Sequence, residues 1–370
     1  MTHQLIDTDD GLSAVLKAHI GEHFVAVDTE FRRRDTFFPQ PALLQLCWKE
    51  TAYLIDPTKV SDLDGIVELL ANPTTVKFIH SPSEDLEVFD RWLGVLPEPL
   101  FDTQRALAAL GRGFGLGYRA MVETYTGEII SKEETTSDWL RRPLSTQQLS
   151  YAALDVTYLR KIGQQLYDTC ADKGRLEWIF EDTRRLGVGG RGPAAKFRSA
   201  WKLTDTQQQI LNALIDWRES EARRLDRPRS WLLPDKVMVA LAKRRPTHLA
   251  QLGTVDGLHD SVIRKRGDQI LDTIDRSSSL SATLPPAWAP PLTVDERSWA
   301  ARLSEVVKQR AVELDVAPEV LCATKDVERF IQAFVSQQAL PPELLGWRET
   351  AITHQLERKL SDLIARSSAP

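Results

Sequence analysis

Two acidic side chains, Asp28 and Glu30, stand two residues apart at the end of a short apolar run, in the stretch AVDTEF. Side chains at this spacing on a β-strand point to the same face of a sheet. Two adjacent carboxylates repel each other unless a cation lies between them, and Mg²⁺ and Mn²⁺ prefer oxygen ligands. The pair could therefore bind a divalent metal ion. A surface-exposed pair without a ligand, which is common by chance, is the alternative.

Two further acidic positions could complete such a site. Asp85 follows another apolar run, in KFIHSPSED, where it could bind a cation or simply favour the N-terminal dipole of a helix. Tyr151 and Asp155, in SYAALDVTYL, are four residues apart and share one face of a predicted helix. The apolar neighbours of Asp155 indicate burial, and a buried carboxylate needs a partner or a metal. An exposed Asp155 with Tyr151 merely packing beside it is the alternative.

Alternating strands and helices in the first half of the chain must position these residues. Short apolar runs predict strands at 23–28, 42–48, 51–55 and 76–79, and the second and third of these should form a hairpin. Helical periodicity predicts helices at 85–93, 103–110, 116–125 and 145–170. This mixture predicts an α/β domain with a mixed sheet.

Two stretches rich in Gly, Pro and Ser divide the chain, at 187–197 and 277–291. Helical patterns at 205–225 and at about 296–314 follow them. The expected domains are therefore an α/β domain at 1–190 and two small helical domains at 205–277 and 295–366. The similar size of the two helical domains hints at a divergent repeat.

The net charge is unevenly distributed along the 370 residues. Residues 1–190 carry 20 Lys and Arg against 29 Asp and Glu, whereas residues 191–290 carry 17 against 11. A basic middle region attracts nucleic acid, although a gradient of this size could also be accidental.

Composition excludes several classes of protein. A content of 42% hydrophobic and 27% charged residues excludes disorder as the main state, and no apolar run approaches the roughly 20 residues of a membrane span. The N-terminus is polar and acidic, which is untypical of a signal peptide. Three scattered cysteines argue against a disulfide framework. We therefore expect a reduced, cytoplasmic protein that does not associate with membranes.

The three acidic motifs, in this order, resemble the DEDD superfamily of 3′–5′ exonucleases, and Tyr151 is typical of its tyrosine branch. The resemblance narrows to the ribonuclease D family through DTEFRRRDTFFPQPALLQL, KFIHSPSEDLEVF and the SDWxxRPL segment at 137–144. The helical domains are similar to HRDC domains, the first more closely than the second. This resemblance implies an RNase H-like α/β catalytic domain followed by two small all-α HRDC-like domains.

The same resemblance implies a metal-dependent exoribonuclease. Two Mg²⁺ or Mn²⁺ ions, about 3.5–4 Å apart, would be held by Asp28, Glu30, Asp85 and Asp155. One ion would activate a water and the other would stabilise the leaving 3′ oxygen. Tyr151 would orient that water or accept its proton, and 5′-mononucleotides would be released. The expected substrates are the 3′ ends of tRNA precursors and other structured RNA, with no obligate protein partner.

Substrate contacts are predicted from residue type alone. Phe31 could stack on a terminal base, or it could be a core residue. The candidate phosphate contacts could equally be solvated surface charges; they are Arg33, Lys132, Arg142, and the basic run Arg264, Lys265 and Arg266. Two alternative functions remain open: a DNA-directed exonuclease of the same superfamily, and a non-catalytic nucleic-acid-binding protein on this scaffold.

Overall fold

The computed structural model describes residues 2–130, 134, 137–187, 192–280 and 288–367. The chain forms two compact units. The first comprises Met1–Arg32, Pro41–Val188 and Leu292–Pro370, and the second comprises Arg33–Gln40 and Gly189–Pro291. The C-terminal helices therefore belong to the same unit as the α/β region.

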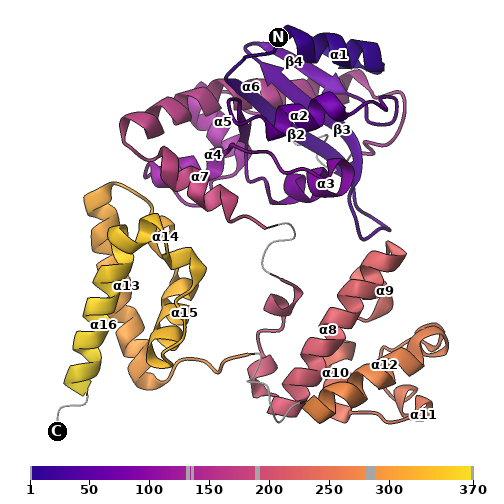
Figure 1. Ribbon diagram of the computed structural model, residues 1–370, viewed down its shortest axis with the longest axis vertical. Coiled ribbons are helices and arrows are strands. Elements are labelled where there is room, and N and C mark those ends of the chain that lie inside the picture. The colour runs from indigo at the N-terminus through magenta and orange to yellow at the C-terminus, as the bar shows by residue number, and fades with distance from the viewer. Residues whose placement is uncertain (1, 131–133, 135–136, 188–191, 281–287, 368–370) are drawn as a thin grey trace. The chain divides into compact units, whose positions relative to one another are not determined.

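A six-stranded mixed sheet forms the centre of the α/β region of the first unit (Figure 1). Its strands lie in the order β1-β4-β3-β2-β5-β6. The antiparallel pairing of β3 with β4 confirms the predicted hairpin, whereas β1 with β4, β2 with β5, and β5 with β6 are parallel pairs. The strands are β1 (Thr2–Ile6), β2 (Phe24–Arg32), β3 (Gln40–Trp48), β4 (Thr51–Ile55), β5 (Val76–Ile79) and β6 (Leu100–Asp102).

Helices cover both faces of this sheet because β2 is apolar on both sides. Val25 and Val27 pack with α1 (Asp9–Ala18), α2 (Asp64–Ala71) and α3 (Ser83–Leu93). Ala26, between them, points to the other face and packs in a second cluster. That cluster is formed with α4 (Thr103–Ala109), α5 (Tyr118–Thr126), α6 (Thr146–Asp172) and α7 (Leu176–Arg184).

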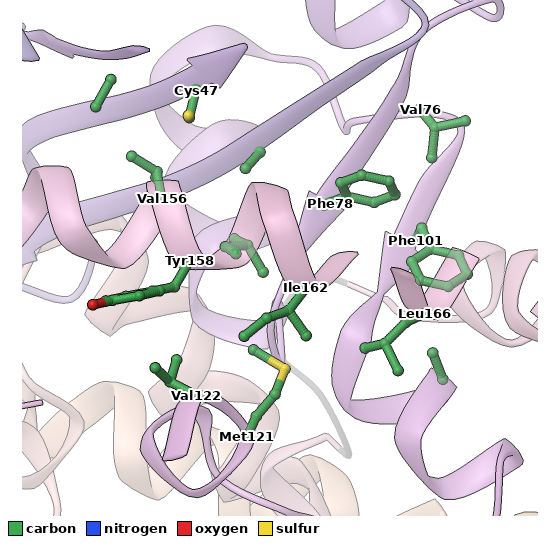
Figure 2. Packing of buried hydrophobic residues seen from close by; sticks show 14 of the residues in the cluster. Cys47, Val76, Phe78, Phe101, Met121, Val122, Val156, Tyr158, Ile162 and Leu166 are labelled. Atoms are coloured by element: carbon green, nitrogen blue, oxygen red, sulfur yellow. The ribbon is translucent and has the colours of Figure 1, made fainter. Parts of the chain in front are cut away.

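The long helix α6 packs closely on the sheet. Figure 2 shows Val156 and Ile162 of α6 among side chains that include Cys47 and Phe78 of the strands. A Cβ atom at Gly163 would lie 2.7 Å from the Phe78 ring, so only glycine allows this approach. A Ser145 capping box starts the helix, which fixes its register and hence the positions of the residues that it carries.

The structure confirms the predicted fold class and corrects several element boundaries. The strand predicted at 23–28 continues to Arg32, so Asp28 and Glu30 lie within β2 and not at its end. The prediction missed β1 because four of its five residues are exposed and it lacks an apolar run, and β6 because it has only three residues. Helices α1, α2 and α7 were also not predicted, and α12 of the second unit extends into the predicted break as far as Leu280.

The C-terminal part of the first unit is a helical module with its own core. It docks on α7 through a stack of Trp178 on Trp347, whose ring centroids are 4.2 Å apart. Arg175 also donates hydrogen bonds to the carbonyl oxygens of Leu314 and Asp315. Its elements are α13 (Val294–Leu314), α14 (Pro318–Leu321), α15 (Thr324–Val335), the short helices η3 (Pro342–Leu344) and η4 (Glu349–Thr353), and α16 (His354–Ser367).

The second unit is a separate helical module around its own apolar core. The segment 33–40 belongs to it: the amides of Phe37 and Phe38 both donate to Asp226, and the Phe37 ring lies under the Arg229 guanidinium. Across the described part of the chain, no helix has the length and apolar character to cross a membrane. The helices are η1 (Pro193–Lys196), η2 (Ala200–Lys202), α8 (Asp205–Leu225), α9 (Arg229–Leu232), α10 (Asp235–Arg244), α11 (Leu249–Leu252) and α12 (Asp260–Leu280).

Candidate active site

Asp28 and Glu30 follow Ala26 at alternate positions of β2, so all three residues share the face of the sheet that α6 covers. Both carboxylates are half-buried. The sequence prediction that they share one face therefore agrees with the geometry of the strand.

Asp85 joins this pair from the other side of β2. It lies in the first turn of α3, is 8% exposed, and accepts a hydrogen bond of 2.5 Å from the Thr29 hydroxyl. Thr29 stands between Asp28 and Glu30 in the strand, so this hydrogen bond fastens α3 to the segment that carries the pair. Asp85 is thus more than a residue that favours the helix dipole.

Asp155 comes from α6 and is 7% exposed. One of its oxygens, Oδ1, is fully buried and has no hydrogen-bond partner. The Tyr151 side chain, one turn earlier on the helix, is hydrogen-bonded to the carboxylate. The Tyr151 ring packs against the buried Trp139 at a centroid distance of 6.0 Å, which holds it over this part of the site.

The four carboxylates influence one another electrostatically. Burial, followed by the charges of Asp85, Asp155 and Glu30, raises the pKa of Asp28 well above its usual range. Burial and the charges of Asp155 and Asp85 raise the pKa of Glu30 to about 9. Burial also raises the pKa of Asp85 to about 6 and that of Asp155 to about 7, although hydrogen bonds from Thr29 and Tyr151 oppose these shifts. A bound cation would compensate the negative charge of such a cluster of carboxylates.

The donor chemistry fits divalent cations. All four groups offer carboxylate oxygens, and the partnerless Oδ1 of Asp155 is the kind of buried atom that a metal ion satisfies. Within the described ranges, no three His, Cys, Asp or Glu side chains are arranged as a ready-made metal site. Binding would therefore involve some rotation of these side chains.

All the hydrogen bonds of Arg142, in the SDWxxRPL segment, are made to other groups of the protein. Its guanidinium makes two hydrogen bonds to the buried Asp56 carboxylate, at 2.6 and 2.7 Å, and three more to the carbonyls of Ala42, Trp139 and Arg141. All five of its N–H donors are thereby used. These hydrogen bonds anchor the segment that supplies Trp139, and they favour a structural role for Arg142 over a phosphate contact.

The other predicted substrate residues that the structure describes lie in different parts of the two units. Phe31 is half-buried on β2, and strand alternation directs it to the face opposite Asp28 and Glu30. Lys132 lies outside the described residues. Arg33 belongs to the second unit, as do the exposed Arg264 and Lys265; Arg266, from the same run, is ion-paired with Glu221.

Two more residues lie beside the carboxylates. Tyr118, the first residue of α5, donates a hydrogen bond to the main-chain oxygen of Asp155. No spacing relative to the acidic motifs indicated its place. His80 precedes the second motif, where packing is the expected role because Mg²⁺ and Mn²⁺ prefer oxygen ligands. It hydrogen-bonds Thr103 and the carbonyl of Leu116, so it packs beside the site and does not join the carboxylates.

A mixed sheet, with acidic motifs from β2, α3 and α6 that come together, defines a DEDD-type 3′–5′ exonuclease domain. A family model described as 3′-5′ exonuclease matches residues 3–170, and a model described as HRDC domain matches residues 207–274. The chain belongs to the ribonuclease D family and is a 3′–5′ exoribonuclease. This superfamily depends on divalent metal ions.

The similarity to ribonuclease D extends over almost the whole chain. Ribonuclease D of Xanthomonas oryzae pv. oryzae is 38% identical over 353 residues, which are 94% of each chain. Ribonuclease D of Escherichia coli is 31% identical over 375 residues, or 98% of this chain and 99% of that one. The crystal structure of the Escherichia coli enzyme superimposes with a TM-score of 0.83 over 98% of this chain and 99% of that chain.

Proposed function

We propose that this exoribonuclease hydrolyses RNA from the 3′ end with two divalent ions, Mg²⁺ or Mn²⁺, and releases 5′-mononucleotides. Asp28, Glu30, Asp85 and Asp155 would hold the ions. When bound, such ions activate water and stabilise negative charge at the leaving oxygen. We also propose a cytoplasmic location, as the composition led us to expect, and no obligate protein partner.

The observation that carries this proposal is the buried, partnerless Oδ1 of Asp155 beside Asp28 and Glu30, whose pKa values are raised by burial and by the neighbouring carboxylates. Without a cation, this cluster must either bury like charges or hold protons far above the usual pKa of a carboxyl group, and either state costs free energy. A metal site removes that cost.

The Tyr151 phenol has the role of positioning the attacking water. It lies one helical turn from Asp155 and is held between that carboxylate and the Trp139 ring. A free phenol has a pKa of about 10 and is a poor base at neutral pH. A hydrogen bond that orients the water is therefore the more economical role.

We propose tRNA precursors with 3′ extensions and other structured RNA as substrates. The similar Escherichia coli enzyme is described as an exoribonuclease involved in structured RNA processing. In this chain the HRDC-like unit exposes Arg264 and Lys265 on α12, which can contact phosphates without regard to sequence.

A 5′-labelled RNA with a structured body and a 3′ extension tests this proposal. With Mg²⁺ or Mn²⁺, the wild-type chain should give a ladder that shortens from the 3′ end, and without divalent ions it should give none. Asp155→Asn should abolish the ladder. Asp168→Asn is the matched control, because Asp168 is an exposed carboxylate on the same helix.

A DNA oligomer of the same sequence, tested beside the RNA, addresses the DNA-directed alternative. Faster degradation of the DNA would overturn the substrate assignment. An RNA that stays intact with either metal, although it is bound, would instead support the non-catalytic alternative.

A further inference from the structure

Tyr118 connects α5 to the catalytic face of α6. Its hydroxyl donates to the main-chain oxygen of Asp155, the same residue whose carboxylate lies in the site. The remainder of the half-buried side chain packs on the hydrophobic cluster beneath α6. This hydroxyl therefore contacts the backbone of a proposed metal ligand directly.

Two side chains donate hydrogen bonds to the main chain just before Tyr118. The carbonyl of Leu116 accepts hydrogen bonds from His80 Nε2 and from Gln104 Nε2, both at 3.1 Å. Because a carbonyl only accepts, Nε2 of His80 carries a proton, and Nδ1 is hydrogen-bonded to the Thr103 hydroxyl at 2.9 Å. Burial lowers the pKa of His80, which favours the neutral form of the ring.

The His80 ring also contacts the Tyr118 ring edge to face, with centroids 5.6 Å apart and planes at 70°. His80 directly follows β5 and lies five residues before Asp85. Tyr118 is thus in contact with the β5–α3 connection on one side and with Asp155 on the other. We call Tyr118, His80 and the Leu116 carbonyl the Tyr118 brace.

The Tyr118 phenol remains a proton donor in this environment. Burial and the charges of Asp155 and Asp28 raise its pKa well above the usual value. The hydrogen bond to the Asp155 carbonyl needs only a protonated phenol, which is the ordinary form at neutral pH.

We propose that Tyr118 is a positioning residue for metal binding: through the brace it sets the spacing between the elements that carry Asp85 and Asp155. This inference rests on the proposed function. Divalent ions tolerate little displacement of their ligands, and loss of an outer hydrogen bond to a ligand typically weakens metal affinity about 10-fold or more.

Calorimetric titration of the full chain with Mn²⁺, without RNA, tests the inference independently of activity. Tyr118→Phe should bind at least one Mn²⁺ about 10-fold more weakly than the wild type. Tyr125→Phe is the matched control: Tyr125 lies on the same helix and packs on the same cluster, and no hydrogen bond joins its hydroxyl to α6 in the described part of the chain. It should bind Mn²⁺ as the wild type does.

Steady-state kinetics add a second readout. At limiting Mn²⁺, Tyr118→Phe should lower kcat and leave the KM for RNA unchanged, and excess Mn²⁺ should largely restore kcat. His80→Leu, which removes a donor to Leu116 without touching Asp155, should shift Mn²⁺ affinity in the same direction by a smaller factor. This variant keeps the inference testable if Tyr118→Phe folds poorly.

The outcomes separate the two proposals. If the wild type binds Mn²⁺ and degrades RNA but Tyr118→Phe matches Tyr125→Phe in Mn²⁺ affinity, the positioning role is wrong and the proposed function stands. An equal loss of affinity in both variants would indicate general loosening of α5 and would also overturn the role. A wild type that neither binds Mn²⁺ nor degrades RNA removes both proposals.

Discussion

Asp182 and Arg348 form a buried, bidentate ion pair that joins α7 to the C-terminal helical module. The two guanidinium nitrogens lie 2.5 and 2.7 Å from the two carboxylate oxygens. Arg105 and the Trp347 indole also donate to Asp182, at 3.1 Å each. Burial would raise the pKa of Asp182, but Arg348, Arg105 and the Trp347 indole together outweigh that effect and lower it. The module is thus fixed to the α/β region by a charged centre.

Arg348→Met should destabilise the chain, because it leaves the buried Asp182 carboxylate with fewer compensating donors. Breaking a buried pair from one side costs about 3–5 kcal/mol in the free energy of unfolding. Urea unfolding followed by tryptophan fluorescence measures this loss, since Trp178 and Trp347 lie at the junction.

Arg358→Met provides the control for that substitution. Arg358 is exposed on α16 of the same module, and its contact is to a carbonyl within its own helix. Its loss should change the free energy of unfolding by less than about 1 kcal/mol. Equal effects of the two substitutions would show that the Asp182 pair does not stabilise the junction.

Mg²⁺ should stabilise the chain more strongly as the pH rises. The pKa values are about 9 for Glu30, about 7 for Asp155 and about 6 for Asp85 in the folded chain, against about 4 in the unfolded chain. The folded state therefore holds more protons between about pH 4 and 9, and its free energy of unfolding falls as the pH rises through that window. A bound Mg²⁺ ion compensates the negative charge that these protons neutralise at lower pH. Mg²⁺ should therefore raise the free energy of unfolding most at high pH, where the protons are lost.

Thermal unfolding with and without Mg²⁺ between about pH 5.5 and 8.5 measures this dependence. The rise in Tm caused by Mg²⁺ should grow with pH and reach about 5 °C at saturating metal. Asp85→Asn combined with Asp155→Asn should flatten it. A rise in Tm that is constant or shrinks with pH would contradict the assignment of the cluster as the metal site.

Much of this site could be predicted from the sequence because its chemistry is local. Asp28 and Glu30 share a strand face, and Tyr151 and Asp155 share a helix face, so each pair is visible as a spacing of two or four residues. Their convergence depended on the family resemblance, since nothing in the spacing relates β2 to α6.

The contacts that support the site could not be predicted in this way. Tyr118 reaches Asp155 across 37 residues, and Arg142 reaches Asp56 across 86. Such contacts depend on tertiary packing, which leaves no periodic trace in the chain. Arg142 illustrates this: its residue type suggested a phosphate contact, and its hydrogen bonds to Asp56 and to three carbonyls could not be foreseen from the sequence.

Arg142→Gln should act on stability and not on RNA affinity. The buried Asp56 carboxylate would lose its ion partner, at a cost of about 3 kcal/mol. Urea unfolding should show this loss, whereas the Kd for single-stranded RNA, measured where the variant is folded, should change less than about twofold. A tenfold weaker Kd with unchanged stability would restore Arg142 as a phosphate contact.

Arg264→Gln combined with Lys265→Gln should reduce the salt dependence of RNA binding. Both side chains are exposed on α12, and each phosphate contact contributes about 0.7 to the slope of log K against log salt for a single strand. The slope should fall by about 1.4. Arg266→Gln, which removes one of the two arginine partners of Glu221, should leave the slope unchanged and lower the stability. Equal slopes for the wild type, the double variant and Arg266→Gln would exclude α12 from the RNA interface.

Anomalous diffraction from crystals of the full chain grown with Mn²⁺ would give the number of bound ions and their ligands. The account predicts two Mn²⁺ ions in the first unit, both coordinated by oxygens of Asp28, Glu30, Asp85 and Asp155, with Asp155 Oδ1 among the ligands. Mn²⁺ bound only elsewhere, or four carboxylates that stay unliganded at saturating Mn²⁺, would contradict it.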